Sequence, residues 1–494
     1  MSMISDRFEP LFNPNSVVFV GASRNPGKWG FIILANILNG GYEGRVYPIN
    51  PKEKEILGLE VHSSIEGLPE IPDLAVIVVP PPSVPGVVAE CVKKGIKAAL
   101  VITAGFAEIG AEGERLQNET VRIARQGGMT MVGPNCQGII SISSKLHALM
   151  PPLFPPPGPL SIVSQSGNVA GTVARKCMSR GFGFSKYLST GNEAALHCED
   201  VFEYLAEDPE TKVILSYIEG FKDGRRFLET AKRVTAKKPI VMLKAGGTIA
   251  GAKAAKSHTA SLAGSDSIFD AVCKQAGVIR VRDMDELFYV GAALAGGFMP
   301  KGRRVGIITG GGGWGVLASD ACAMAGLEVV ELPEETIKEL DTFLPSWWSR
   351  GNPVDLVAGL RPGDVQNSFE VLLACPNIDG VILLGLTPAL PRHTDWLSSG
   401  GLERSGKINN IVLDEIGDVF SRLMDMAHSY GKALVVASEM PFETEMLQKI
   451  GERGGVCYTL PDQAAFVFAS LARYAEYLRE SDARTEAIPR CTGP

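Results

Sequence analysis

Short apolar runs that end in glycine or proline alternate with helical segments along most of this chain. In the first third, strands are predicted at 16–21, 45–50, 74–79, 98–103 and 130–133, and helices at 31–39, 84–94 and 110–126. Apolar strands that alternate with helices are typical of a parallel sheet with helices on its faces. The pattern therefore predicts an α/β protein whose first domain has Rossmann-like winding.

The same alternation continues in the rest of the chain. Strands are predicted at 160–163, 184–189, 211–218 and 239–244, and then at 305–308, 327–330, 380–384 and 432–437. The proline-dense stretch 151–159 is stiff and poor in hydrogen-bond donors, so it is the best domain boundary. We expect a Rossmann-like domain at 1–150, flavodoxin-like domains at 160–297 and 298–477, and a flexible tail at 478–494.

Bulk composition excludes several classes of protein. The chain has 494 residues, a net charge of −7 and no long basic run, so no nucleic-acid partner is expected. No apolar run approaches the roughly 18 residues of a membrane span, and the N-terminus lacks a secretory apolar segment. The nine cysteines are scattered without a C-x-x-C pair, which favours the reducing cytoplasm; no resident metal is predicted.

The first predicted strand leads into the glycine loop 21–30, ahead of a helix. Such a loop suits a phosphate at the carboxyl edge of a parallel sheet. It is not G-x-G-x-x-G, and Asn50 rather than an acidic residue follows the second strand, so NAD is disfavoured and another nucleotide-like ligand stays open. Asn135 could present its amide to that ligand. The alternative is a loop that only turns the chain.

A second possible phosphate site follows the connector. It consists of Ser164, Gln165, Ser166, Gly167 and Asn168, which join a predicted strand to a predicted helix. Hydroxyl groups beside the unpaired N–H groups and positive dipole of a helix start make a cradle for an oxyanion. An ordinary serine N-cap is the alternative reading.

Glu219 and His258 complete a possible catalytic group. His258 lies among small and hydroxylated residues at 253–264, and Glu219 follows a predicted strand. A neutral imidazole can attack an activated phosphate, and a carboxylate on its other nitrogen would fix the tautomer. The alternatives are a histidine that steadies a loop and a solvated surface glutamate.

The glycine run 309–315 in the last predicted domain admits two readings. Glycines there could let the backbone bind an anion, or could only permit tight packing at a domain interface.

Six motifs in order resemble the α subunit of NDP-forming acyl-CoA synthetases, the ADP-forming acetyl-CoA synthetase branch of the succinyl-CoA synthetase superfamily. They are Gly21-Ala-Ser23, Gly133-Pro-Asn-Cys136, Ser164-Gln-Ser-Gly167, Thr190-Gly-Asn192, Ile218-Glu-Gly220 and Ser257-His-Thr-Ala-Ser-Leu-Ala-Gly264. The resemblance covers most of the chain. Trp314 departs from the family's usual glycine loop, so the ligand of that loop is not predicted.

The resemblance implies a CoA-binding first domain, a second domain with a phosphohistidine at His258, and Glu219 as its supporting carboxylate. The Ser164–Asn168 turn would hold phosphate. The implied CoA contacts are Gly21, Ala22, Ser23, Lys28, Asn50, Pro80, Thr103, Ala104, Gly105, Phe106 and Asn135.

The predicted reaction is the reversible conversion of acyl-CoA, phosphate and ADP to carboxylic acid, CoA and ATP, an acid–thiol ligase reaction through an acyl phosphate and a phosphohistidine. The sequence shows no P-loop and no stretch long enough for an ATP-grasp domain, so ATP or ADP and Mg²⁺ are expected on a separate ATP-grasp β subunit. The alternative is a non-catalytic CoA-binding or scaffold protein of the same fold.

Overall fold

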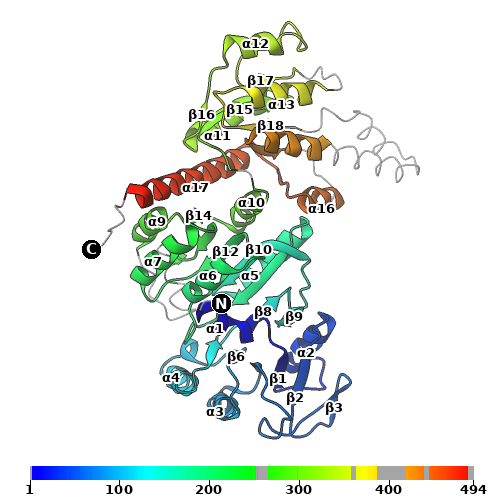
Figure 1. Cartoon of the computed structure of the whole chain (residues 1–494), viewed down its shortest axis with the longest axis vertical. Helices are drawn as coiled ribbons and strands as arrows, with labels where there is room; N and C mark the ends of the chain where they lie inside the picture. The colour runs from blue at the N-terminus through cyan, green and yellow to red at the C-terminus, as the bar shows by residue number, and fades with distance from the viewer. Residues whose placement is uncertain are drawn as a thin grey trace, which may run out of the picture. The chain divides into compact units, whose positions relative to one another are not determined.

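The computed structural model describes residues 3–248, 250–251, 253, 265–297, 299–357, 363–385, 419–438 and 444–487 (Figure 1). The chain forms two compact units. The first contains residues 1–178 and 183–287, and the second contains residues 179–182 and 288–494. No helix in the described ranges is long and apolar enough to cross a membrane.

The first sheet has five parallel strands in the order β2-β1-β5-β6-β7. Its strands are β1 (Ser16–Val20), β2 (Arg45–Ile49), β5 (Leu74–Ile77), β6 (Ala98–Val101) and β7 (Thr130–Val132). All residues of β1, β5, β6 and β7 are buried, because both faces of the sheet are covered. The predicted parallel sheet is confirmed.

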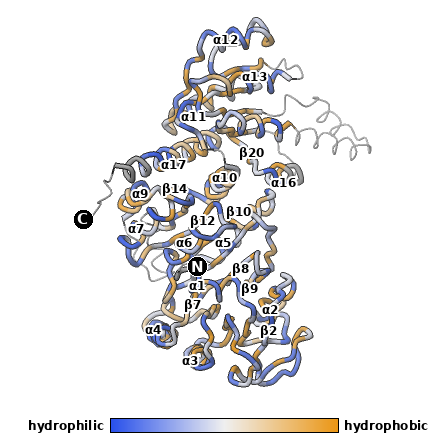
Figure 2. Tube along the Cα trace, viewed as in Figure 1, coloured by the Kyte–Doolittle hydropathy of each residue, from blue (hydrophilic) through white to orange (hydrophobic). Residues whose placement is uncertain are grey.

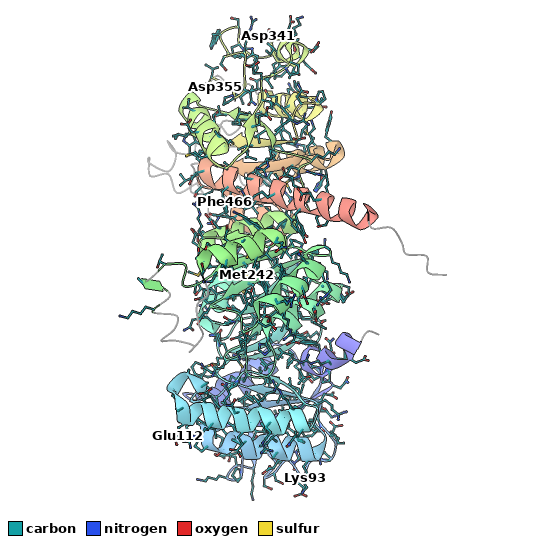
Figure 3. The ribbon with its side chains drawn as sticks, turned by 90° about the vertical axis from the view of Figure 1, so that its left-hand side faces the viewer. Lys93, Glu112, Met242, Asp341, Asp355 and Phe466 are labelled. Atoms are coloured by element: carbon teal, nitrogen blue, oxygen red, sulfur yellow. The ribbon has the colours of Figure 1, made fainter. Side chains whose placement is uncertain are left out.

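Helices connect and flank these strands. They are α1 (Met3–Phe12), α2 (Trp29–Asn39), α3 (Val84–Lys94), α4 (Ala111–Gln126) and the 3-10 turns η1 (Pro81–Ser83) and η2 (Ala107–Ile109); β3 (Glu55–Ile56) and β4 (Leu59–Glu60) form a small hairpin. Helices α3 and α4 pack against each other, and Lys93 and Glu112 mark their exposed sides in Figure 3.

The second sheet also lies in the first unit, in the order β14-β13-β12-β10-β11-β8-β9. Its strands are β8 (Gly138–Ser141), β9 (Leu146–Leu149), β10 (Pro157–Ser164), β11 (Phe184–Ser189), β12 (Val213–Ile218), β13 (Ile240–Lys244) and β14 (Ile279–Val281). The helices are α5 (Gly167–Ser179), α6 (Cys198–Glu207), α7 (Gly224–Thr235), α9 (Asp266–Gln275) and α10 (Met284–Ala295), whose last turns belong to the second unit.

The β8–β9 hairpin shows how closely the first two sheets are joined. Both strands precede the proline-dense connector, yet β8 pairs antiparallel with β11 in the second sheet. One hydrophobic cluster runs from α1, through β1 and β5, to α6 and α9. The hairpin joins the second sheet because its eight residues are all buried and need partners for their backbone groups.

The second unit contains a third sheet, in the order β16-β15-β18-β19-β20 with β17 beside β15. Its strands are β15 (Arg304–Thr309), β16 (Glu328–Val329), β17 (Val354–Asp355), β18 (Gly380–Leu384), β19 (Ala433–Ala437) and β20 (Cys457–Tyr458). Its further helices are α11 (Gly312–Met324), α12 (Glu334–Leu340), α13 (Asp364–Ala374), α16 (Thr444–Glu452) and α17 (Pro461–Ala487).

Helix α17 corrects the predicted start of the flexible tail. The helix continues to Ala487, well past residue 478. Hydrophobic and hydrophilic residues alternate along it in Figure 2, and Phe468 and Leu471 are buried. Arg479 and Glu480, two charged residues after Tyr477, are exposed on this helix.

The same strand order recurs in all three sheets. Five parallel strands, numbered along the chain, are arranged 2-1-3-4-5 in each sheet. The hairpin β8–β9 extends the second sheet, and the short strand β17, left out of this numbering, pairs with β15 in the third. Sheets of this order bind ligands at the carboxyl ends of strands 1 and 3, where the connections diverge. Ligand sites are therefore expected at three places, which are the carboxyl ends of β1 and β5, of β10 and β12, and of β15 and β18.

Candidate functional site

The turn from β10 into α5 places the predicted phosphate-binding residues beside the end of β12. Ser164 is the last residue of β10 and is fully buried. Its hydroxyl donates to the Ser166 carbonyl at 2.7 Å and accepts the Ser166 N–H at 3.2 Å. The Ser164 side chain therefore shapes the turn and does not face a ligand, which corrects its predicted role. Ser166, Gly167 and Asn168 stay accessible at the start of α5, where N–H groups lack intrahelical partners.

The Gln165 side chain ties this turn to β12. Its Oε1 accepts the Glu219 N–H at 2.6 Å and the Gly220 N–H at 3.3 Å, and its Nε2 donates to the Gly220 carbonyl at 2.9 Å. Gln165 was predicted as one of the phosphate-binding residues of this turn. Because both of its ends are engaged by backbone groups, it instead fixes the distance between the phosphate turn and the carboxylate.

Glu219 lies directly after β12 and is only 3% exposed. The adjacent strand β13 ends at Lys244, opposite Ile218, and the Ala245 N–H donates to the Ile218 carbonyl at 2.9 Å. The segment that carries His258 thus leaves the sheet next to Glu219. His258 itself lies outside the described residues.

The two ends of the His258 segment are close together. A Cβ built at Gly247 would lie 3.1 Å from Asp266 Oδ1, on the first residue of α9. Arg280 Nη2 binds that same Oδ1 at 2.6 Å. Residues 248–264 therefore begin and end at one place on the carboxyl edge of the second sheet.

A buried acid cluster, which the sequence analysis missed, lies after β11. It consists of Glu193, His197 and Glu199, whose possible ligand atoms lie within 4.8 Å of one another, the only such set in the described ranges. The Cys198 N–H donates to Glu193 Oε1 at 3.2 Å, and the Cys198 thiol donates to Glu199 Oε2 at 3.3 Å. The absence of a resident metal stays a prediction.

The pKa values of two residues in this acid cluster are strongly shifted. Burial and the neighbouring Glu199 raise the pKa of Glu193 to about 7, and burial lowers the pKa of His197 to about 4. The ammonium group of Lys222 donates to the Glu193 carbonyl at 2.6 Å. Glu193 also has a positive φ of 51°, a conformation that costs free energy outside glycine. The only sequence signal was its position directly after the Thr190-Gly-Asn192 motif.

The predicted CoA contacts of the first domain gather where β1 and β5 diverge. Gly21 has a φ of 99°, and a Cβ there would lie 2.3 Å from the Val78 carbonyl oxygen. Asn50, at the end of β2, donates from Nδ2 to the Ala22 carbonyl at 2.7 Å. Ala22 is buried, whereas Ser23 is partly accessible. Only glycine lets the two strand ends approach this closely.

Three further predicted CoA contacts are exposed at neighbouring loops. Lys28 immediately precedes α2, Pro80 follows β5, and Ala104 follows β6. Thr103 holds two of these loops together, because its hydroxyl donates to the Val79 carbonyl at 2.7 Å. These residues can line one ligand site at the carboxyl edge of the first sheet.

Phe106 was predicted as a CoA contact, and its ring does not face the strand ends. The ring is fully buried in the hydrophobic core under α3 and α4. Gly105, with a φ of 102°, donates its N–H to Glu108 Oε1 at 2.6 Å. Any contact of CoA with Phe106 is therefore limited to the main chain, while the ring anchors the loop.

Asn135 links the loops of the first sheet to those of the second. Its Nδ2 donates to Asn192 Oδ1 at 3.1 Å. Asn192 in turn donates to Glu108 Oε2 at 2.6 Å and to Gln117 Oε1 at 3.0 Å. The amide of Asn135 is thus a structural link between the predicted CoA loops and the Thr190-Gly-Asn192 motif.

The glycine run of the second unit repeats the geometry of the phosphate turn. The Thr309 hydroxyl donates to the Gly311 carbonyl at 2.8 Å and accepts the Gly311 N–H at 3.2 Å. Asp355 Oδ2 lies 3.0 Å from a Cβ built at Gly312, and Gly315 packs tightly on Thr309 and Pro353. The nearby carboxylate disfavours an anion at this helix start. The tight packing of Gly315 is against residues of its own unit, so packing at a domain interface stays a prediction.

Three family models match successive parts of the chain. They are described as CoA binding domain for residues 15–141, Succinyl-CoA ligase like flavodoxin domain for residues 157–294, and Ligase-CoA domain for residues 305–390. The first two cover the strand ends described above.

Relatives match the chain over nearly its whole length. The α subunit of the ADP-forming acetate–CoA ligase II of Pyrococcus furiosus is 38% identical and covers 94% of this chain and 97% of its own. The ADP-forming 4-hydroxybutyrate–CoA ligase of Nitrosopumilus maritimus is 33% identical over 96% of this chain and 65% of its own.

A solved structure agrees with these relatives. An acetyl-coenzyme A synthetase 1 of Ca. Korarchaeum cryptofilum, determined with phosphate and ADP, superposes with a TM-score of 0.84 at 32% identity and covers 96% of this chain and 98% of its own. The chain belongs to the family of ADP-forming acetate–CoA ligases, in the form of their α subunits.

Proposed function

We propose that this chain is the α subunit of an ADP-forming acyl-CoA synthetase that works through a phosphohistidine at His258. The observation that carries the proposal is the adjacency of three strand ends. The phosphate turn after β10, Glu219 after β12 and the His258 segment after β13 leave neighbouring strands at one edge. One histidine loop can therefore reach both a bound phosphate and a buried carboxylate.

The first step joins phosphate to the acyl group. A phosphate oxygen attacks the thioester carbonyl, the carbon–sulfur bond breaks, and CoA leaves as a thiolate with an acyl phosphate remaining. Phosphate would lie at Ser166, Gly167 and Asn168, where helix N–H groups stabilise its charge. CoA would lie along the exposed loops at Ser23 and Lys28.

The second step moves the phosphoryl group to His258. One ring nitrogen attacks phosphorus, the bond to the acyl oxygen breaks, and the carboxylic acid leaves as a carboxylate. Glu219 would accept the N–H of the other ring nitrogen, which orients the ring and stabilises its positive charge. Gln165 serves as a positioning residue, because it holds the backbone of Glu219.

The third step, transfer of the phosphoryl group to ADP, is assigned to a separate β subunit of the ATP-grasp type. The relative from Pyrococcus furiosus is named as an α subunit, which supports a partner. Mg²⁺ would neutralise the phosphates at that nucleotide site. We place the enzyme in the cytoplasm, because the eight cysteines in the described ranges are free thiols.

The test replaces His258 and measures two activities of the full chain. His258→Asn should abolish acyl-CoA-dependent ATP formation in the presence of the partner subunit while leaving CoA binding intact. His428→Asn, which alters an exposed histidine in the second unit, is the matched control and should retain both. Turnover by His258→Asn contradicts the proposal, and CoA binding without turnover by the unaltered protein favours the non-catalytic alternative.

A further inference from the structure

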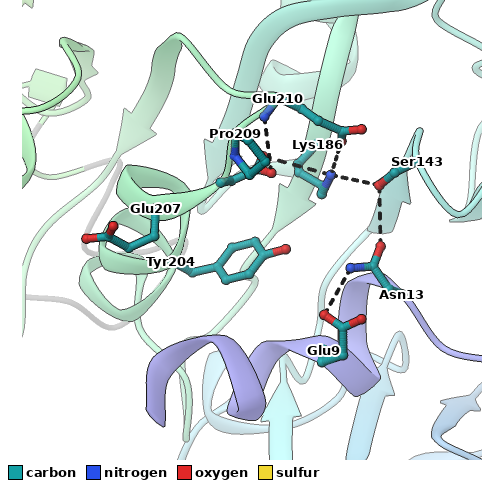
Figure 4. A pocket seen from close by; sticks show the side chains of 9 residues that line it. Glu9, Asn13, Ser143, Lys186, Tyr204, Glu207, Pro209 and Glu210 are labelled. Atoms are coloured by element: carbon teal, nitrogen blue, oxygen red, sulfur yellow. Dashed lines mark hydrogen bonds and ion pairs between the residues drawn. The ribbon is translucent and has the colours of Figure 1, made fainter. Parts of the chain in front are cut away.

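A cavity of about 270 Å³ lies in the first unit, away from the site described above. Its walls come from α1, the β8–β9 turn, β11, and the end of α6 with the loop that follows (Figure 4). That loop precedes β12, so the cavity lies at the amino edge of the second sheet. The phosphate turn and Glu219 lie at the carboxyl edge. No step of the proposed mechanism uses these residues.

Tyr204 presents an unused hydroxyl group to the cavity. The residue is 7% exposed, and its ring stacks on Phe8 and Phe12 with centroid distances of 4.9 Å each. Figure 4 shows the hydroxyl directed into the cavity. It has no hydrogen-bond partner among the described residues, and it is not one of their fully enclosed polar atoms, so it is accessible from the cavity. This hydroxyl is thus available to a ligand.

Lys186 gives the cavity a buried cation that is already engaged. It is 2% exposed, and its Nζ donates to Glu210 Oε2 at 2.6 Å and to Ser143 Oγ at 3.1 Å. A second carboxylate, Asp208, lies 3.8 Å away. Two of the three donors of this ammonium group are used by these hydrogen bonds, and its charge is balanced by the two carboxylates. Lys186 therefore does not make the cavity a site for anions.

The remaining charge of the cavity is negative. Four carboxylates line it, and Lys186 is shared between two of them. Glu207 pairs with Lys237. Glu9 accepts a hydrogen bond at 3.1 Å from the amide of Asn13, which is uncharged. The pKa of the Tyr204 hydroxyl is raised mainly by burial. The charges of nearby carboxylates, which include Asp208 and Glu9, raise it further.

Two helix ends add to this negative potential. Helix α1 ends at Phe12 and helix α6 ends at Glu207, so the carbonyl ends of both helices face the region of the cavity. The C-terminal end of a helix favours cations. One ammonium group is already bound there, because Lys238 Nζ donates to the carbonyls of Leu205, at 2.7 Å, and Asp208.

We propose that this cavity binds a small organic cation with primary ammonium groups. The Tyr204 hydroxyl would accept one N–H, and the Glu9 carboxylate would pair with the charge. A bare metal ion fits less well, because the carboxylates of this cavity do not form a group of three ligand atoms within 4.8 Å of one another. Among the described residues, only Glu193, His197 and Glu199 form such a group. The volume of about 270 Å³ admits a short diamine. This site is independent of the proposed enzymatic function.

The experiment is calorimetric titration of the full-length chain with 1,4-diaminobutane at low ionic strength. We expect saturable binding with one site per chain, and no binding of the uncharged 1,4-butanediol or of the anion butanedioate. Tyr204→Phe keeps the stacked ring and removes only the hydroxyl. Glu9→Gln removes one charge, and Glu66→Gln removes a charge from an exposed residue elsewhere in the first unit.

Tyr204→Phe and Glu9→Gln should each weaken diamine binding about tenfold or more, as expected for loss of a hydrogen bond to a charged group. Glu66→Gln should bind as the unaltered chain does, and all three variants should keep its melting temperature within a few degrees. Absence of saturable binding, equal weakening by Glu66→Gln, or preferential binding of butanedioate would each overturn the proposal.

Discussion

At the residue scale, the candidate site depends on a few side chains whose roles are structural. Gln165 holds Glu219 through three hydrogen bonds to backbone groups. Gln165→Ala should lower the free energy of unfolding by about 1.5–4.5 kcal/mol, since each of the three bonds contributes about 0.5–1.5 kcal/mol. It should also slow phosphoryl transfer more than it weakens CoA binding.

Denaturant unfolding and steady-state kinetics check this prediction. Gln126→Ala is the matched control, because Gln126 is exposed at the end of α4 and accepts one hydrogen bond from Arg122. If Gln165→Ala behaved like this control in both measurements, the positioning role would be rejected.

A second prediction concerns Glu193, whose pKa is raised to about 7 by burial and by Glu199. The folded chain keeps this proton up to about pH 7, while the unfolded chain releases it near the ordinary value of 4.5. Between these values the folded state binds more protons, so this group makes stability fall as pH rises. Glu193→Gln removes the effect and should lose less stability than the unaltered chain between pH 5 and pH 7.5.

Unfolding free energies measured across that range provide the check, with Glu66→Gln as the control for loss of a carboxylate. His197, whose pKa is lowered to about 4, has the opposite effect, because its contribution to stability is lost as pH falls from 6.5 toward 4. That contribution is common to both proteins. Parallel pH profiles for Glu193→Gln and the unaltered chain would show that Glu193 ionises normally.

Residue types in the sequence indicated which chemistry to expect but not where each group points. The Ser164 hydroxyl was predicted to help hold phosphate, and Gln165 was placed in the same turn, yet the side chains of both are engaged by backbone groups. Phe106 was placed among CoA contacts, and its ring is in the core. Such orientations depend on residues from other strands, which local sequence does not show.

At the element scale, the turn after β1 should be sensitive to a single methyl group. Gly21→Ala would place a Cβ 2.3 Å from the Val78 carbonyl oxygen at a φ of 99°. Gly58→Ala is a matched control, because Gly58 also has a positive φ, 79°, but nothing lies within 4 Å of its Cβ position. The control measures the cost of an alanine at positive φ alone, about 1–3 kcal/mol, without the steric clash.

We expect Gly21→Ala to lose more stability than Gly58→Ala and to lose CoA binding, while Gly58→Ala should bind CoA normally. Thermal unfolding with and without CoA measures both effects. Equal destabilisation by the two variants would mean that the β1–β5 approach is not tight.

Most central strands of the three sheets were predicted because they are largely apolar and end at turn residues, and the α/β fold class is confirmed. The short strands β14, β17 and β20 were not predicted. The place of the β8–β9 hairpin in the second sheet was not predicted, since its pairing with β11 depends on residues that are distant in the sequence. The end of α17 was missed for a local reason. Residues 478–487 are charged, which suggested a tail, but they are rich in Leu, Arg, Glu and Ala, which favour helix.

At the scale of the whole molecule, the account requires that phosphoryl-group formation and ATP formation be separable. The described strand ends supply a phosphate turn and a carboxylate beside the His258 segment. The proposed mechanism assigns ATP formation to a separate β subunit. The isolated chain should therefore take up phosphate from acyl-CoA and inorganic phosphate without making ATP, and addition of the β subunit with ADP and Mg²⁺ should release that phosphoryl group as ATP.

The most direct test is peptide mass mapping of the full-length chain after incubation with acetyl-CoA, inorganic phosphate and Mg²⁺, alone and with the partner subunit. The account predicts one acid-labile phosphoryl group on His258, absent when CoA replaces acetyl-CoA and lost when ADP and the partner are added. A phosphoryl group on another residue, or ATP formation without any phosphorylated form of His258, would contradict it.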